Sequence, residues 1–327
     1  MISTIIVAAA ISLKSIAFLL AGILALWFAA DWLVQGASKI AVNLKIKPMV
    51  VGLTIVAFGT SAPELLVSVS AALRDQPGVA WGNIVGSNVA NIALVLGVCA
   101  FLSPIEIDRK TLTSELPMML AATVLCYICA FIGTGLVLVD GIIFILFLAY
   151  FIYRAFSGAK DGDELDEETA ELVRGSKKGM NAWYIFQIVV GFGGLVLGAK
   201  WLVLGATDIA TAFGLSQVFI GLSIVAFGTS LPELAASGMA AWRGKTELSI
   251  GNVVGSNIFN IVLVLGVTSI IAPIQLTKAD LSNELLWMLA VSFFLYGLCW
   301  FGKKLTKRHG TILLMTYVAF IYFTYKG

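Results

Sequence analysis

The sequence contains a long internal duplication. When the chain is shifted by 169 positions, residues 51–98 align with residues 220–267 without a gap, and 29 of the 48 paired residues are identical. The first matching block reads Gly-Thr-Ser-x-Pro-Glu and ends at Glu64 in one copy and at Glu233 in the other, and the second reads Gly-Asn-x-x-Gly-Ser-Asn-x-x-Asn. A duplication of this length predicts that the chain folds as two copies of one structural unit.

The composition around these blocks excludes a water-soluble domain. Of the 327 residues, 59% are hydrophobic and only 12% are charged, whereas a soluble domain carries about 25% charged residues. Apolar windows of about 20 residues, long enough to cross the hydrocarbon core of a bilayer, follow one another along the chain. We therefore expect an all-α polytopic membrane protein, surrounded by lipid, with ten spans at residues 14–35, 48–72, 80–102, 113–132, 136–154, 183–207, 217–241, 249–271, 283–302 and 310–325.

One long polar connection divides these spans into two sets of five. We expect a first five-helix repeat over 1–154, a linker of acidic and basic residues over 155–182, and a second repeat over 183–327. Because five is an odd number, the second repeat must enter the membrane from the opposite side. The ten transmembrane helices then form two inverted five-helix repeats, which is typical of secondary transporters that bind their substrate near the midplane.

The distribution of Lys and Arg predicts how the chain is oriented. If both termini are outside, the inner connections hold about 16 of the 21 Lys and Arg residues and the outer connections hold about four. Cytoplasmic connections normally carry the excess of these residues. We therefore predict an integral protein of the plasma (cell inner) membrane, with both termini outside and the 155–182 linker in the cytoplasm.

Glu64 and Glu233 lie in the middle of apolar windows. An ionisable side chain at that depth costs several kcal/mol unless it is paired or faces a wet cavity. The proline before each glutamate removes a backbone donor, and the nearby glycine weakens the helix. We expect the carbonyls of residues 57–61 and 226–230 to be freed and to face a cavity, because lipid cannot bond to them.

The second block adds further oxygen atoms on the next span. Asn91 and Asn260 follow the two glutamates by 27 residues, so this span can return antiparallel after a tight connection. Four more side chains of the block offer oxygen ligands, namely Ser87, Asn88, Ser256 and Asn257. Close approach of helices is expected at four glycines with small-xxx-small spacing, namely Gly82, Gly86, Gly251 and Gly255. Carboxylates, amides, hydroxyls and carbonyls together suit Ca²⁺ or Na⁺ and offer no sulfur or nitrogen to a softer metal.

These paired blocks resemble the duplicated repeats of the cation/calcium exchanger superfamily, and most closely those of its bacterial and archaeal sodium/calcium exchanger branch. The resemblance covers nearly the whole chain. It implies ten helices and alternating access, in which the first and sixth spans slide over a core of the other eight. It also implies overlapping central sites for which one Ca²⁺ and the counter-transported Na⁺ ions compete.

The resemblance also assigns ligands by position. It implies that Glu64 and Glu233 are the principal calcium ligands. The further ligands that it implies for calcium or sodium are the carbonyls of Ala57, Thr60, Ala226 and Thr229 and the side chains of Thr60, Ser61, Ser87, Thr229, Ser230 and Ser256. Some microbial members and the potassium-dependent exchangers carry aspartate at the position of Asn260, whereas this chain has asparagine in both copies. The resemblance therefore implies that asparagine at this position disfavours potassium dependence. The asparagine amide still offers an oxygen to a cation.

The leading hypothesis is Na⁺-driven Ca²⁺ antiport, because both ions take oxygen ligands and have similar radii. The alternative is an H⁺/Ca²⁺ antiporter in which the same two glutamates take protons. The hydroxyl and amide groups around the glutamates favour sodium, since a proton needs only the carboxylates. A cation channel would instead show voltage-driven flux without dependence on a counter-ion.

Several other classes of function are not expected. An enzyme is not expected, because the serines have no histidine or lysine nearby that could act as a base. A nucleic-acid-binding protein needs a basic face, and the net charge is only +2. Cys126 and Cys129 could form a redox pair or hold a metal, but one helical turn apart on a span they are expected to be small apolar side chains. The sequence implies no cofactor besides the transported Ca²⁺ and Na⁺, and no obligate protein partner.

Overall fold

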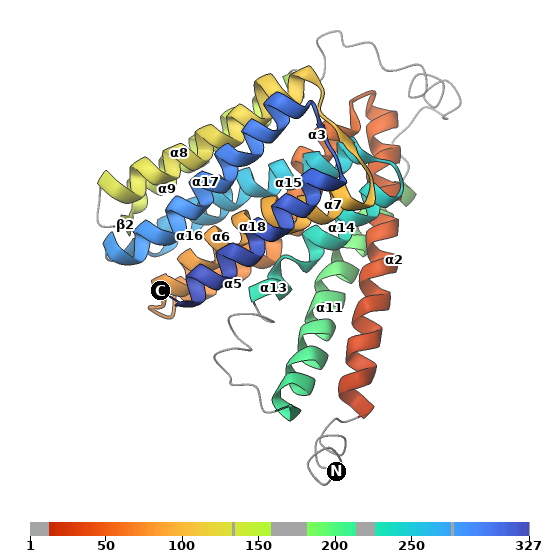
Figure 1. Ribbon diagram of the computed structural model, residues 1–327, viewed down its shortest axis with the longest axis horizontal. Helices are drawn as coiled ribbons and strands as arrows, with labels where there is room; N and C mark the ends of the chain where they lie inside the picture. The colour runs from red at the N-terminus through yellow and green to blue at the C-terminus, as the bar shows by residue number, and fades with distance from the viewer. Residues whose placement is uncertain (1–12, 133–134, 158–181, 214–225, 276–277, 327) are drawn as a thin grey trace.

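The computed structural model describes residues 13–132, 135–157, 182–213, 226–275 and 278–326, and they are mostly helical (Figure 1). In the first copy the elements are α2 (Leu13–Leu44), α3 (Pro48–Val51), η1 (Gly52–Val56), α4 (Ala57–Thr60), α5 (Ala62–Ala72), α6 (Pro77–Ala90), η2 (Asn91–Val95), α7 (Leu96–Leu102), β1 (Ile105–Glu106), η3 (Thr111–Glu115), α8 (Leu116–Ile132), β2 (Gly135–Leu136) and α9 (Leu138–Ser157), where η denotes a π-helix. In the second copy they are α11 (Ala182–Ala212), α13 (Ala226–Thr229), α14 (Leu231–Trp242), α15 (Thr246–Phe259), η5 (Asn260–Leu265), α16 (Gly266–Ile271), β3 (Ile274–Gln275), α17 (Lys278–Gly302), β4 (Lys304–Leu305) and α18 (Lys307–Lys326).

The described residues form seven helices that are long and apolar enough to cross a membrane, or up to eight if a bent helix pair counts as one span. The bent pair covers Pro48–Thr60 and Ala62–Ala72. The predicted span 217–241 lies partly outside the described residues. The predicted span 310–325 falls within α18, which has 20 residues, as many as α9, but is not among the helices apolar enough to cross a membrane. The chain is therefore a mostly helical integral membrane protein.

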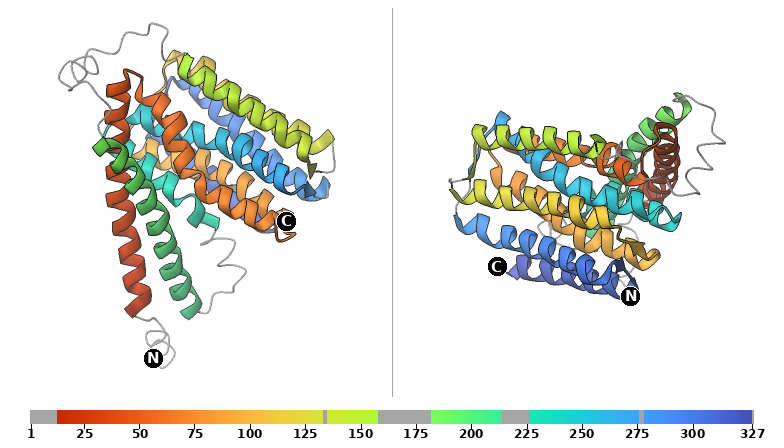
Figure 2. Two further views of the ribbon diagram at one scale, coloured as in Figure 1. Left: turned by 180° about the vertical axis from the view of Figure 1, so that it is seen from behind. Right: turned by 90° about the horizontal axis from the view of Figure 1, so that it is seen from above.

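Helices α2 and α11 pack along each other and lie together at one side of the other helices (Figure 2). Helix α2 continues to Leu44, nine residues beyond the end predicted for the first span. It ends where Lys45 adopts a left-handed φ of 55° and the Ile46 amide bonds back to the Ala41 carbonyl at 3.0 Å. This is the hydrogen bond that closes many helix ends, so backbone geometry and not hydropathy sets the end of α2.

Two pairs of short strands join the copies in the part of the chain that the structure describes. β1 pairs antiparallel with β4, and β2 pairs antiparallel with β3. A shift of 169 positions converts β1 into β3 and β2 into β4, so the two pairs are equivalent. They lie at opposite ends of α8 and α17, which pack against each other (Figure 1). These two equivalent helices therefore run antiparallel.

The two spans that carry the second block, one in each copy, form the centre of the protein. In the apolar windows of Pro77–Leu102 and Thr246–Ile271, 78% of the residues are buried, against 22% in the window of α2. Close packing is confirmed at Gly251 and Gly255, where a side chain would meet η1 and its flanking residues. No described residue approaches Gly82 or Gly86 in this way, and the chain equivalent to η1, residues 221–225, lies outside the described residues.

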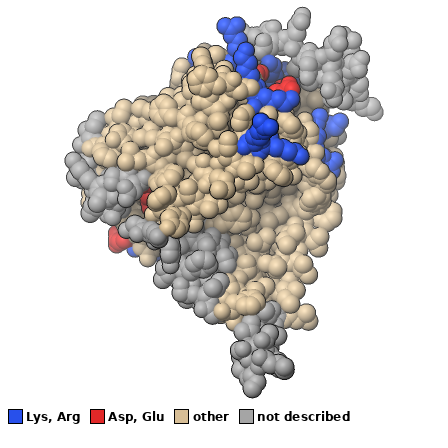
Figure 3. All heavy atoms as spheres, viewed as in Figure 1, with Lys and Arg blue, Asp and Glu red and all other residues tan. Residues whose placement is uncertain are grey.

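The charged side chains are unevenly distributed. On the face shown in Figure 3, Lys and Arg side chains gather at one end of the molecule, where α8 and α17 approach β1 and β4. Helix α2 begins at the opposite end (Figure 1). The apolar surface between these ends matches a protein whose sides contact lipid.

Candidate cation site

Glu64 and Glu233 occupy equivalent places at the break of two helices. Each lies in the first turn of its helix, α5 or α14, and each is 0% exposed. The residues before these helices, Ser61 and Ser230, have nearly identical backbone angles, with φ of −80° and −87° and ψ of 0° and 3°. These angles lie outside the helical region, so the chain bends, by 41° in the first copy. Both carboxylates therefore sit at a helix N-terminus, where the peptide dipoles favour negative charge.

Contacts between the copies bring the two carboxylates together. The Ser87 hydroxyl on α6 donates to Glu64 Oε1 at 3.4 Å, and Thr229 of the other copy also lies near Glu64. Thr60 lies near Glu233 in the same crossed manner, and the two carboxylates are close enough to repel each other. The structure thus places the predicted glutamates, threonines and Ser87 around one point between the copies.

Many polar atoms at this point have no hydrogen-bond partner among the described residues. They include Glu64 Oε2, both carboxylate oxygens of Glu233, and the hydroxyls of Ser61 and Ser230. A buried polar atom without a partner costs about 1–3 kcal/mol, and a carboxylate costs more. A cation would satisfy such a group of oxygens, because it needs acceptors and supplies the opposite charge.

Asn91 and Asn260 lie at the start of the π-helical segments η2 and η5. Both are 0% exposed, and both atoms of each amide lack a hydrogen-bond partner in the described structure. A π-helix accommodates one extra residue in a helix, which redirects the side chains beside it, and it is frequent at functional sites. The predicted asparagines are therefore buried with oxygen atoms available to a ligand.

Other predicted ligands make bonds of their own. The Asn88 and Asn257 amide groups each donate to a carbonyl four residues earlier in their own helix, at 2.8 Å. The Ala57 carbonyl accepts the Ser61 amide at 3.0 Å and the Thr60 hydroxyl at 3.4 Å. The prediction that the carbonyls of residues 57–61 and 226–230 are freed is thus wrong at Ala57, because its helical bond persists. It is also wrong at three other carbonyls, which accept the amides of Leu65, Ser230 and Leu234 at 3.2, 3.2 and 3.0 Å, namely those of Ser61, Phe227 and Ser230. Pro63 lacks the N–H that would bond to the Gly59 carbonyl. Ala226 begins α13.

The structure adds Asn83 and Asn252, which the sequence reasoning did not select as site residues. Asn83 Nδ2 donates to the Glu64 carbonyl at 3.3 Å and to Ser68 Oγ at 2.9 Å. The equivalent Asn252 Nδ2 donates to Ser237 Oγ at 2.8 Å, and its oxygen accepts from Thr60 at 3.3 Å.

These asparagines support the side chains that surround the glutamates. Thr60 also lies 3.2 Å from the Ser256 hydroxyl. Asn83 and Asn252, and Ser68 and Ser237, are identical pairs in the duplication, which could have identified them.

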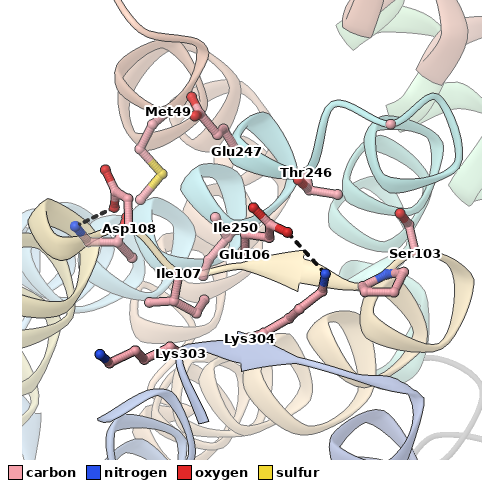
Figure 4. A pocket seen from close by; sticks show the side chains of 13 residues that line it. Met49, Ser103, Glu106, Ile107, Asp108, Thr246, Glu247, Ile250, Lys303 and Lys304 are labelled. Carbon is pink, nitrogen blue, oxygen red and sulfur yellow. Dashed lines mark hydrogen bonds and ion pairs between the residues drawn. The ribbon is translucent and has the colours of Figure 1, made fainter. Parts of the chain in front are cut away.

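A separate cavity of about 560 Å³ lies at the end of the protein that carries the β1–β4 pair (Figure 4). Glu106 pairs with Lys304 across these strands at 3.0 Å, and Asp108 accepts the Thr111 amide at 2.7 Å. None of the predicted site residues lines this cavity. The cation site and this cavity are therefore distinct.

The cysteines are buried thiols. Cys126 and Cys129 are free and buried, and the prediction that they act only as small apolar side chains stays a prediction. Among the described residues, no group of three or more His, Cys, Asp or Glu side chains gathers as in a classical metal site. Two carboxylates together with neutral oxygen ligands suit a hard cation that binds reversibly, and they do not suit tight binding of a transition metal.

Comparison with known proteins relates the chain to antiporters and exchangers along nearly its whole length. It is 39% identical to the putative antiporter CaxA of Alkalimonas amylolytica, over 95% of this chain and 98% of that protein. It is 32% identical to the sodium/calcium exchanger MaX1 of Methanosarcina acetivorans, over 93% and 96% of the two chains. A solved structure of the sodium-calcium exchanger NCX_Mj superposes with a TM-score of 0.79 and 30% identity, over 94% of this chain and 98% of that one.

A single family model, described as "Sodium/calcium exchanger protein", matches residues 14–157 and again residues 183–326. The two matches are offset by 169 positions, the same shift that aligns the internal duplication. Such exchangers are transporters and not a class of enzymes. With relatives in bacteria and archaea, this chain belongs to the bacterial and archaeal branch of the sodium/calcium exchanger family of membrane antiporters.

Proposed function

We propose that this protein exchanges Na⁺ for Ca²⁺ by alternating access, with overlapping sites for the two ions where the copies meet. One observation carries the proposal: two buried carboxylates from different copies converge with buried oxygens that lack partners in the described structure. Two carboxylates balance the charge of one Ca²⁺. When the Ca²⁺ leaves, Na⁺ ions can occupy the same oxygens, because both are hard cations.

The ligands of the proposed site come in equivalent pairs. Glu64 and Glu233 bind Ca²⁺ from opposite sides. The hydroxyl and amide oxygens complete the calcium site and the flanking sodium sites, and the residues that supply them are Thr60, Thr229, Ser61, Ser230, Ser87, Ser256, Asn91 and Asn260. The Ala57 carbonyl already accepts two hydrogen bonds, so an ion there replaces the longer one, from the Thr60 hydroxyl at 3.4 Å. The Ala226 carbonyl is the equivalent ligand of the second copy.

The proposal includes ten helices in two inverted repeats. The antiparallel course of α8 and α17, and the crossed pairing of the strands, support it because equivalent elements of inverted copies must run in opposite directions. The end of the molecule rich in Lys and Arg faces the cytoplasm in this arrangement (Figure 3). Both termini are then outside, and the 155–182 linker is cytoplasmic.

Calcium flux into vesicles tests the choice of counter-ion. Protein is reconstituted into vesicles loaded with Na⁺ and diluted into Na⁺-free buffer with radioactive calcium. We expect rapid calcium uptake that stops when Na⁺ is equal on both sides, and no stimulation when K⁺ replaces Na⁺. Uptake that follows an imposed pH gradient and ignores Na⁺ would instead establish H⁺/Ca²⁺ antiport. Flux that follows voltage alone would establish a channel.

Replacing Asn252 by alanine is expected to weaken calcium binding without removing a ligand. Asn252 holds Thr60 and Ser237 in place through bonds of 3.3 and 2.8 Å. Loss of such a supporting residue typically lowers metal affinity about 10- to 100-fold. The calcium dependence of exchange measures the effect. Thr123→Ala, which removes a buried hydroxyl bond of 2.9 Å on α8, is the control, and an equal loss in both variants would contradict the supporting role.

A further inference from the structure

An apolar groove of about 450 Å³ lies between α2 and α14. Ile23 and Trp27, one turn apart on α2, form one wall, and Gly238 and Trp242, one turn apart on α14, form the other. Leu102 of α7 and Leu202 of α11 also line it. Its lining is almost wholly apolar, and its wall residues Ile23, Leu102 and Trp242 are exposed, so it opens on the outer surface of the protein. Hydrocarbon must fill such a groove, because an empty space would leave its walls without contacts.

Glycine at position 238 creates the space in the groove. A Cβ atom at Gly238 would have only one atom within reach among the described residues, Leu102 Cδ1 at 4.0 Å. The equivalent position in the first copy is Val69, and the position equivalent to Trp242 is Leu73. The residues that shape the groove therefore differ between the copies, although the neighbouring site residues are identical.

The groove ends beside charged residues. Arg243 follows Trp242 directly and pairs with Asp31, which lies one turn beyond Trp27 on α2. The Arg243 side chain is still 47% exposed, and Lys245 is exposed as well. A guanidinium has five N–H donors, so Arg243 can hold a phosphate while it remains paired with Asp31.

The two tryptophans mark the polar end of the groove as the level of the lipid headgroups. The Trp27 and Trp242 rings lie 4.6 Å apart between centroids and are 48% and 58% exposed. Tryptophan is enriched at the boundary between hydrocarbon and headgroups because its ring is apolar and its N–H is polar. The order of these features matches the order of the parts of a phospholipid. The apolar groove corresponds to an acyl chain, the tryptophan pair to the glycerol region, and the exposed side of Arg243 to the phosphate.

We propose that the groove binds one anionic phospholipid, with an acyl chain between α2 and α14 and its phosphate on Arg243. The lipid then forms part of the contact between α2 and the helices it lies across. This site is separate from the cation site, and its occupation does not depend on which ions the protein exchanges.

Native mass spectrometry of the purified, delipidated full-length protein tests the proposal, with phosphatidylglycerol or phosphatidylcholine of the same acyl chains added back. We expect one phosphatidylglycerol per chain to bind about fivefold more tightly than phosphatidylcholine, the preference typical of one basic residue at a membrane surface. Arg243→Gln should remove this preference, and Gly238→Phe should abolish retention of either lipid.

The first copy supplies matched controls, because Arg74 and Val69 are equivalent to Arg243 and Gly238. Arg74→Gln and Val69→Phe should bind phosphatidylglycerol as the unchanged protein does. Equal affinity for the two lipids, undiminished retention by Gly238→Phe, or the same loss in the control variants would overturn the proposal.

A second measurement avoids reliance on the folding of Gly238→Phe. Phosphatidylglycerol with brominated acyl chains is added to the unchanged protein and to Trp27→Phe and Trp242→Phe, and quenching of tryptophan fluorescence is followed. We expect brominated phosphatidylglycerol to quench at lower concentration than brominated phosphatidylcholine, and each substitution to reduce the high-affinity part of the quenching. Identical quenching curves for the two lipids, or for all three proteins, would contradict the proposed site.

Discussion

Replacing Glu64 or Glu233 by alanine is expected to abolish calcium transport while the protein still inserts and folds. Each change removes one of two carboxylates that are 0% exposed and close to each other. Losing one charged partner in a buried site costs about 3–5 kcal/mol, which corresponds to a loss of calcium affinity of more than about a hundredfold. Sodium-driven calcium uptake by reconstituted vesicles measures the result.

The same substitutions should stabilise the protein when no ion is present. Without a cation, the two carboxylates repel each other, and their oxygens lack partners in the described structure, so removing one relieves an unfavourable interaction. Thermal unfolding in detergent, with and without calcium, separates this effect from misfolding. Glu106→Gln is the control, because its side chain is 79% exposed and lies in the separate cavity near β1. Normal transport by both glutamate variants would refute the assignment of the site.

Replacing Gly255 by alanine is expected to destabilise the protein strongly. A Cβ atom there would lie 2.5 Å from the Leu53 carbonyl oxygen and 2.7 Å from Ala57 Cβ. Neither atom belongs to a flexible side chain, so α15 and η1 must move apart. Overpacking of this kind costs about 1–3 kcal/mol or more, and the displaced segment leads directly to Thr60. Unfolding in detergent measures the loss of stability, and calcium uptake should fall with it.

Gly297→Ala provides the matched comparison for this substitution. Gly297 lies within α17, and no described atom lies within 4 Å of the position that its Cβ would take. Alanine favours a helix over glycine by about 1 kcal/mol, so this variant should be as stable as the unchanged protein or slightly more stable. If Gly255→Ala unfolded at the same temperature as Gly297→Ala, the tight contact between the copies would be disproved.

The duplication allowed much of the site to be predicted from sequence. A glutamate after a proline in an apolar stretch is conspicuous because burying a charge costs free energy, so such a residue usually binds something. Because it occurs once in each copy, the sequence predicted that the two glutamates meet. The family resemblance also predicted Thr60, Thr229 and Ser87, which the structure places beside the carboxylates. The role of Asn83 and Asn252 was not predicted, since an asparagine that supports another side chain looks like any other polar residue in a helix.

Features that depend on contacts between distant elements could not be predicted. The π-helical segments that start at Asn91 and Asn260 have the composition of ordinary helix, and only packing against the other copy shows where an extra residue is accommodated. The end of α2 was predicted too early because its last turns are more polar, although they remain helical up to Leu44. The paired strands of two residues each are too short to produce an alternating pattern.

The crossed pairing of the strands has a consequence for synthesis of the protein. β1 finds its partner in β4 near the end of the chain, and β2 finds its partner in β3. The first copy therefore leaves the ribosome with the edges of both strands unpaired, and it cannot complete its own hydrogen bonds. The first copy can complete these bonds only after residues 304–305 have been translated, so a product truncated before them lacks the partner of β1.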